Sequence, residues 1–302
     1  KSITKYDSTG IFISTLRNNY FTEGKFYNPS SPIFDNEGNM YILDGNVETR
    51  RIQKFSSGGT YIATVIPTGV IGRAAYYHIF GPDGRMYVSS VAGIQVFDEY
   101  SWVEDTDLLI GEGGPGNGQF SDAAGMVFDA DDNLYVADSQ NHRIQKFILD
   151  DGHYIYDSQF GGGWQGGDDT FEIGELKTPV NIVFDSTYEH IFVSDTRSLK
   201  RYSSAGVYET DYGVNHQLPM GLSIDLDDKL YLSDIWRKTI MVYDSVTGDL
   251  LNTFGLYGGG QMQFENAGTV AFNASGGMVI GDSNGRVQAE IGGFRILNLI
   301  SS

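Results

Sequence analysis

A six-fold internal repeat constrains the fold of this chain more than any other feature. Six short segments alternate apolar and polar residues, and most of them end in aspartate; they are NMYILD (39–44), RMYVSS (85–90), NLYVAD (133–138), HIFVSD (190–195), KLYLSD (229–234) and GMVIGD (277–282). The intervals between their third residues are 46, 48, 57, 39 and 48 residues. A nearly constant period of this size indicates one structural unit used repeatedly.

Each repeat predicts four short strands. An apolar run precedes each segment, a third run such as RRIQKF, GIQVF or HRIQKF follows it, and a fourth run closes near glycine, as in YIYDSQFG. The alternation has period two, and helical spacing is scarce. Units of about 40–50 residues with four antiparallel strands are typical of propeller blades. The sequence therefore predicts an all-β, six-bladed β-propeller of four-stranded antiparallel blades, as a single domain over residues 1–302.

The third repeat carries a family resemblance. Its stretches YVAD, NHRIQKF and GNGQF resemble the NHL-repeat family. The second repeat departs from the pattern with Ser90 in place of the aspartate, and the sixth has Val279 in place of the aromatic residue. The resemblance implies recognition of a protein or glycan by one face of the propeller, often within a larger secreted protein. We therefore expect an extracellular or cell-surface location.

The two ends of the chain predict how the ring closes. The stretch SITKYDSTGIFISTL near the N-terminus matches the third and fourth strands of a repeat, so residues 1–22 are predicted to dock as closing strands of the last blade. GRVQAEI (285–291) and FRILNLI (294–300) both resemble a third strand, and residues 285–302 are left as either a last strand or a tail. The chain opens on Lys1, which we interpret as a processed mature protein or an excised fragment.

Composition excludes several classes of function. A net charge of −19 and a pI near 4.4 argue against nucleic-acid binding, which depends on neutralising phosphates. The RNA-binding role known for some NHL domains needs a basic face that this sequence lacks. The absence of cysteine excludes disulfides and thiolate metal sites. No window approaches 18 apolar residues, so no membrane-spanning helix is predicted.

Acidic and basic residues recur at equivalent positions of the repeats. Because each blade needs the same turn, we interpret these residues as structural, with aspartate accepting backbone hydrogen bonds and arginine bridging to it. This structural set comprises Asp44, Arg51, Asp138, Arg143, Asp195, Asp234, Asp282 and Arg286.

Three acidic runs invite comparison with calcium loops. DNEGN (35–39), DADDN (129–133) and DLDDK (225–229) lack the flanking helices and the spacing of glycine and glutamate that helix–loop–helix calcium sites require. We predict tight turns there instead. Asp168 and Asp169, after the glycine-rich GGGWQGG, are the weak metal candidates. No metal site and no cofactor are predicted, with calcium the one ion left open.

Catalytic motifs are missing. The sequence contains no Gly-X-Ser-X-Gly elbow, phosphate loop or His-Glu-X-X-His. The predicted axial positions are Ser31, Tyr77, Gly125, Asn181, Gly221 and Thr269, a set with one amide and no carboxylate. We therefore predict no catalytic residue. The alternative is a metal-dependent propeller enzyme, of lyase or lactonase type, with a divalent ion in the central channel.

Loops at one end of the blades predict a recognition surface. The loops between second and third strands share a face with the loops that enter the first strands. This face is predicted to gather Tyr76, Tyr77, His142, Asn181, Trp236 and Arg237. Tyrosine, tryptophan and arginine are enriched in binding hot spots. The predicted function is a non-catalytic binding module or scaffold for a protein or glycan partner, with a homo-oligomer or larger assembly as a further expectation.

Overall fold

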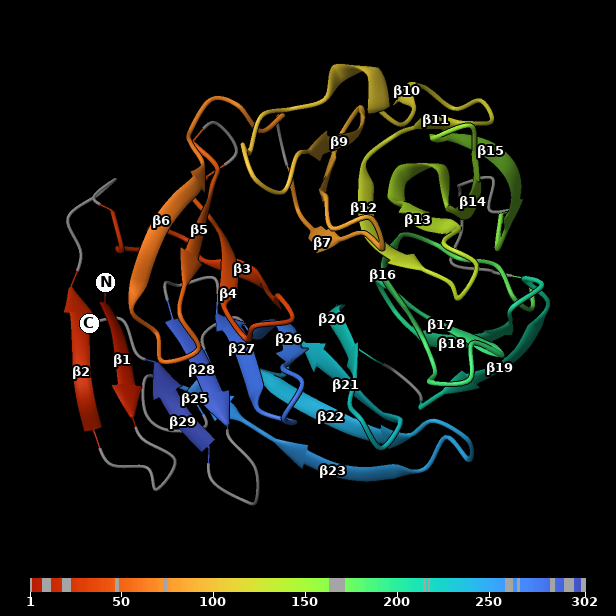
Figure 1. Cartoon of the computed structure of the whole chain (residues 1–302). Helices are drawn as coiled ribbons and strands as arrows, with labels where there is room; N and C mark the ends of the chain where they lie inside the picture. Colours follow the sequence, from red (N-terminus) through yellow and green to blue (C-terminus); the bar gives the residue numbers. More distant parts are fainter. Residues whose placement is uncertain are drawn as a thin grey trace.

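The computed structural model describes most of the chain (Figure 1). The described residues are 2–6, 12–17, 23–46, 49–72, 75–162, 172–213, 216, 218–258, 263–264, 267–282, 286–290 and 296–299. No helix among them has the length and apolar character needed to cross a membrane.

Five sheets have four strands in simple sequential order, and they form blades 1, 3, 4, 5 and 6. Blade 1 contains β3 (Ser30–Phe34), β4 (Met40–Asp44), β5 (Arg51–Phe55) and β6 (Tyr61–Ile66). Blade 3 contains β12 (Ala123–Phe128), β13 (Leu134–Asp138), β14 (Arg143–Asp150) and β15 (His153–Phe160). Blade 4 contains β16 (Pro179–Phe184), β17 (His190–Asp195), β18 (Leu199–Ser203) and β19 (Tyr208–Tyr212). Blade 5 contains β20 (Pro219–Ile224), β21 (Lys229–Asp234), β22 (Thr239–Asp244) and β23 (Leu250–Phe254).

Blade 2 differs from the prediction, because it has three strands, β7 (His78–Phe80), β8 (Met86–Ser90) and β9 (Gly93–Phe97). The chain that follows touches β9 only through two isolated bridges, Ile94 with Ile110 and Phe97 with Glu104. Between the bridges lies the 3₁₀ helix η1 (Thr106–Leu108). The carboxylate of Asp105 accepts a hydrogen bond from the backbone N–H of Asp107, a local bond that competes with a strand ladder.

The inner strands form a closed ring (Figure 1). Each contacts the next in the order β3, β7, β12, β16, β20 and β26, and β26 (Ala267–Phe272) lies against β3. The prediction of a β-propeller of antiparallel blades is therefore confirmed, with five four-stranded blades and a three-stranded sheet in the remaining position.

The two ends of the chain lie together. Blade 6 takes all its strands from the C-terminal part, namely β26, β27 (Met278–Asp282), β28 (Arg286–Glu290) and β29 (Ile296–Leu299). β1 (Ser2–Tyr6) pairs with β2 (Phe12–Arg17), and β1 contacts β29. The hairpin thus lies beside the last blade, and the closing role of residues 1–22 stays a prediction.

The core lies between neighbouring blades. The middle strands are buried on both faces, so that β13 is buried along its whole length from Leu134 to Asp138. Aromatic rings join the blades: the Tyr135 ring of blade 3 meets Phe184 of blade 4 edge to face at 5.2 Å between ring centroids. Two short parallel pairs connect blades, β10 (Glu112–Gly113) with β11 (Gln119–Phe120), and β24 (Leu256–Tyr257) with β25 (Gln263–Phe264).

Candidate binding site

The recurring aspartate and arginine lie in a buried hydrogen-bond network within each blade and the loop that enters it. In blade 3, Asp138 Oδ1 accepts a bond from the backbone N–H of Ser121 at 2.8 Å. Asp138 Oδ2 accepts bonds from Arg143 Nε at 2.8 Å and from Gln145 Nε2 at 3.0 Å. Arg143 also donates to the carbonyl of Gly116 at 2.6 Å. The carboxylate therefore ties the second and third strands to the loop that enters the blade.

Blade 1 repeats this network. Asp44 Oδ1 accepts from the backbone N–H of Tyr27 at 2.7 Å, and Asp44 Oδ2 lies 3.1 Å from Arg51. Gln53 Nε2 also donates to Asp44 at 3.3 Å, so the glutamine of the RIQKF run is a network member that the sequence argument missed. Its recurrence in both runs was the available signal.

The other members of the structural set vary. Asp195 accepts backbone bonds from Arg197 and Ser198, at 2.8 and 2.9 Å. Asp234 accepts one from Arg237 at 3.0 Å. Asp282 and Arg286 are cross-strand partners in the register of β27 and β28, and their side chains lie outside the described residues. Asp168 and Asp169, the weak metal candidates, also lie outside them.

Two of the six predicted rim residues, Tyr77 and Asn181, which the sequence also places at axial positions, are buried. The hydroxyl of Tyr77 donates to the carbonyl of Met220 at 2.9 Å, and Asn181 Nδ2 donates to the carbonyl of Leu222 at 2.9 Å. Both side chains are buried. They hold inner strands together and offer no surface to a partner.

The remaining four predicted rim residues each make contacts of their own. His142 adopts a left-handed conformation, and its Nδ1 contacts the carbonyl of Lys177. Arg237 reaches Asp234, whereas Trp236 is 70% exposed. Tyr76 is exposed and lies 5.7 Å below the guanidinium of Arg50.

The large concavity lies on the opposite face, at the turns between first and second strands. Consecutive turns of an antiparallel sheet lie at opposite ends of its strands, so these turns are far from the predicted rim. A cavity of about 930 Å³, here called the bowl, opens there over blades 1 to 4. Its aromatic lining is Phe34, Tyr41, Phe80, Tyr100, Trp102, Phe128 and Tyr188. Its charged lining is Asp35, Glu37, Lys54, Glu99, Asp129 and Asp132.

An aspartate–tyrosine–lysine trio shapes the wall of the bowl. Tyr41 donates its hydroxyl to Asp35 at 3.2 Å, and Lys54 Nζ lies 3.2 Å from the same carboxylate. Burial raises the pKa of Asp35, but hydrogen bonds from Asn39 and Lys54 outweigh it, so this pKa lies below its usual value. The carboxylate therefore stays ionised at neutral pH.

The acidic runs at these turns are tight turns, as the sequence predicts. Asp129 Oδ1 accepts backbone bonds from Asp131 at 3.0 Å and Asn133 at 2.9 Å. Asp35 and Asp225 make the same bonds in their own blades. Within the part of the chain that the structure describes, no three histidine, aspartate or glutamate side chains are grouped to hold a metal ion.

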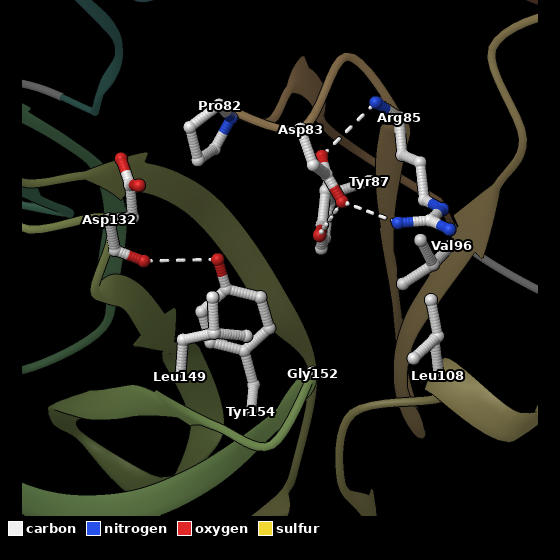
Figure 2. A pocket seen from close by; sticks show the side chains of 10 residues that line it. All are labelled: Pro82, Asp83, Arg85, Tyr87, Val96, Leu108, Asp132, Leu149, Gly152 and Tyr154. Carbon is white, nitrogen blue, oxygen red and sulfur yellow. Dashed lines mark hydrogen bonds and ion pairs between the residues drawn. The ribbon is translucent and has the colours of Figure 1, made fainter.

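A smaller pocket adjoins the bowl between blades 2 and 3 (Figure 2). It measures about 220 Å³ and shares Pro82 and Asp132 with the bowl. Inside it, Asp83 accepts from the Tyr87 hydroxyl at 3.0 Å and pairs with Arg85 at 3.0 Å. Burial, aided by the charge of Asp83, raises the pKa of Tyr154 to about 12. Its phenol is therefore a hydrogen-bond donor at neutral pH.

Comparisons with known proteins agree with the fold. The NHL repeat family matches residues 120–147, the stretch from β11 to β14. The Protein brain tumor of Drosophila melanogaster is 25% identical over 149 residues, which are 48% of this chain and 13% of that protein. The chain thus spans a small part of that relative.

Solved structures resemble it at low identity. A streptogramin B lyase superimposes with a TM-score of 0.64 and 12% identity, over 94% of this chain and 86% of that one. XC5397 of Xanthomonas campestris, a gluconolactonase, superimposes with a TM-score of 0.67 and 12% identity, over 89% and 88%. These likenesses concern the fold alone. The chain thus contains an NHL repeat at residues 120–147, set in a β-propeller of similar blades.

Proposed function

We propose that this propeller is a non-catalytic module that binds a protein or glycan partner in the bowl. The observation that carries the proposal is the bowl itself, whose volume of about 930 Å³ is at the upper end of the ~300–1,000 Å³ typical of ligand pockets. Of the residues predicted for the opposite rim, Tyr77 and Asn181 are buried and cannot meet a partner there. The proposal therefore moves recognition to the other face.

The lining of the bowl suits recognition. Tyr100 is 85% exposed, and Tyr188 is 43% exposed at the other side. Aromatic rings supply large contact area at low entropic cost, and the carboxylates at the bowl supply acceptors for amide, hydroxyl or ammonium donors. The extracellular location, the glycan alternative and the assembly role expected from the sequence stay part of this proposal.

A metal-dependent enzyme is the second candidate. The likeness to a lyase and a gluconolactonase favours it, but one fold hosts many chemistries. Elemental analysis of the purified protein tests this candidate. Stoichiometric calcium or zinc that is lost together with an activity would support it, and its absence in preparations never exposed to chelator would reject it.

Array binding with paired variants tests the module. Wild type, Tyr100→Ser and Trp236→Ser are applied to peptide and glycan arrays, and ligands of the wild type are then titrated. Tyr100 and Trp236 are both strongly exposed, one at the bowl and one on the opposite face, so neither change should unfold the chain. The proposal expects at least a tenfold weakening by Tyr100→Ser alone. A loss confined to Trp236→Ser would reject the bowl.

A further inference from the structure

Lysine covers tyrosine in two blades. In blade 1, Lys54 is the cross-strand partner of Tyr41, and in blade 3 Lys146 is that of Tyr135. Each ammonium lies over the ring of its partner, at 5.0 and 5.1 Å from the centroid. Each also pairs with the aspartate of its first turn, at 3.2 and 3.6 Å. The fold thus repeats an ammonium site built from one carboxylate and one aromatic face.

Blade 2 keeps the carboxylate and the tyrosine but has no lysine. Val96 is the cross-strand partner of Tyr87. In blade 2, Gly81 occupies the usual position of the aspartate. Asp83, two residues further along the chain, supplies the carboxylate instead. A Cβ atom on Gly81 would lie 2.4 Å from Tyr87 Cε2 and 2.7 Å from Asp83 Oδ1. Glycine therefore allows Asp83 to reach the tyrosine hydroxyl.

The small pocket lies where the missing lysine would be. Asp83, Tyr87 and Val96, which stand at the trio positions, all line it (Figure 2). Leu108 of η1 and Leu149 of blade 3 complete an apolar wall. A volume of about 220 Å³ is below the ~300–1,000 Å³ of pockets for larger ligands and suits a single extended chain.

We propose that this pocket binds an alkylammonium group, with the ammonium on Asp83 and over Tyr87, and the alkyl stem against Val96, Leu108 and Leu149. The inference rests on the proposed function where the group is a lysine of the partner docked in the bowl. A free polyamine is the other source of the same chemistry.

Two charged side chains beside the pocket, Arg85 and Asp132, affect how strongly it would bind an ammonium group. Arg85 pairs with Asp83, but its side chain is 37% exposed, and exposed ion pairs are weak enough for a ligand to compete. Asp132 adds a second carboxylate at the junction with the bowl. In blade 5 the equivalent Asp228 accepts the backbone N–H of Ser186 at 2.8 Å. Blade 2 has Pro82 at that place, which lacks an N–H, and no described donor reaches the Asp132 carboxylate.

Calorimetric titration tests the pocket. The probes are Nα-acetyl-lysine methylamide, its uncharged analogue Nα-acetyl-norleucine methylamide, and spermidine. The wild type is expected to bind the lysine probe at least tenfold more tightly than the norleucine probe. Tighter binding of the lysine probe in a peptide points to a partner protein, and tighter binding of spermidine points to a free polyamine; both orders support the ammonium site.

Three variants sharpen the test. Val96→Lys supplies the lysine of blades 1 and 3 and should abolish binding. Asp83→Asn should weaken it at least tenfold, and Arg85→Gln should strengthen it several-fold because a competing cation is removed. Melting temperatures identify any variant that fails to fold. Because Arg85 lies on the surface, Arg85→Gln should fold and can test the proposal even if the other two variants do not.

Two results would overturn the inference: equal binding of the lysine and norleucine probes, or weaker binding by folded Arg85→Gln. Its failure is separable from that of the proposed function. A partner whose binding falls with Tyr100→Ser but not with Val96→Lys would support the bowl and reject the ammonium pocket.

Discussion

The hydroxyl of Tyr77 donates a hydrogen bond to the backbone carbonyl of Met220 at 2.9 Å, and this bond crosses the axis of the ring. Tyr77 belongs to blade 2 and Met220 to blade 5, three positions away in the ring. Burial raises the pKa of Tyr77 well above its usual value, so the phenol remains a donor. The Tyr77 side chain thus joins opposite blades of the ring at this level.

Removing this hydroxyl should destabilise the ring. Tyr77→Phe keeps the ring of the side chain but leaves the partly buried carbonyl of Met220 without this partner, which costs about 1–3 kcal/mol. Chemical denaturation should show this loss of unfolding free energy. Tyr100→Phe, at an exposed position, is the matched control and should change stability by less than about 0.5 kcal/mol. Equal stability of the two variants would argue against the cross-axis bond.

Breaking the buried ion pair of blade 3 should lower the free energy of unfolding strongly. Asp138→Ser leaves the guanidinium of Arg143 buried and unpaired, for an expected loss of about 3–5 kcal/mol. Blade 2 contains Ser90 at the equivalent position without any arginine, and its hydroxyl donates to Gly93 at 2.9 Å. The double variant Asp138→Ser, Arg143→Ala should therefore cost less than the sum of the single changes. Strict additivity in the denaturation cycle would contradict the pairing.

A methyl group near the axis should not fit. A Cβ atom on Gly125 would lie 2.5 Å from Asn181 Oδ1 and 2.6 Å from Asn181 Cα. Gly125→Ala should therefore cost about 1–3 kcal/mol by overpacking. The control is Gly113→Ala, because the nearest atom to a Cβ there, the Ala92 Cβ, is 3.9 Å away. Thermal unfolding of the two variants checks the difference, and a neutral Gly125→Ala would show that blades 3 and 4 are less closely packed than described.

His78 should make the protein acid-sensitive. Its ring is buried, and burial lowers its pKa to about 3 from the ordinary 6.5, a shift that the nearby backbone of Tyr41 opposes only in part. The unfolded chain then binds the extra proton more readily, so this contribution to stability is present above pH 6.5 and is lost as pH falls toward 3. At pH 5 the loss is about 2 kcal/mol.

Replacing His78 should flatten the pH profile. His78→Leu should remove this part of the decline in unfolding free energy between pH 7 and pH 5, as measured by urea denaturation at each pH. His153→Gln alters an exposed histidine and should leave the decline as it is. If both variants decline like the wild type, His78 does not carry the effect.

The alternation of apolar and polar residues predicted most strands correctly. The exception, the fourth strand of blade 2, was decided by side-chain contacts that the alternation does not include. β13 and β14 follow directly from NLYVAD and HRIQKF, because alternation with period two sets the face of every residue. The fourth strand of blade 2 was predicted from the repeat alone. The structure replaces it with η1, because the carboxylates of Asp98 and Asp105 bond to nearby backbone amides there.

The repeat in the sequence determined a ring of sheets and assigned the recurrent aspartate and arginine to equivalent corners, since both depend on contacts within one blade. Only the tertiary structure decided which face is hollow, that the Tyr77 hydroxyl bonds to Met220 on the opposite blade and that Val96 leaves room between blades. These features join residues about one or more repeats apart, such as Tyr77 with Met220 or Asp83 with Leu149. No local pattern encodes such pairs, because the distance between them is set by how whole blades pack around the ring.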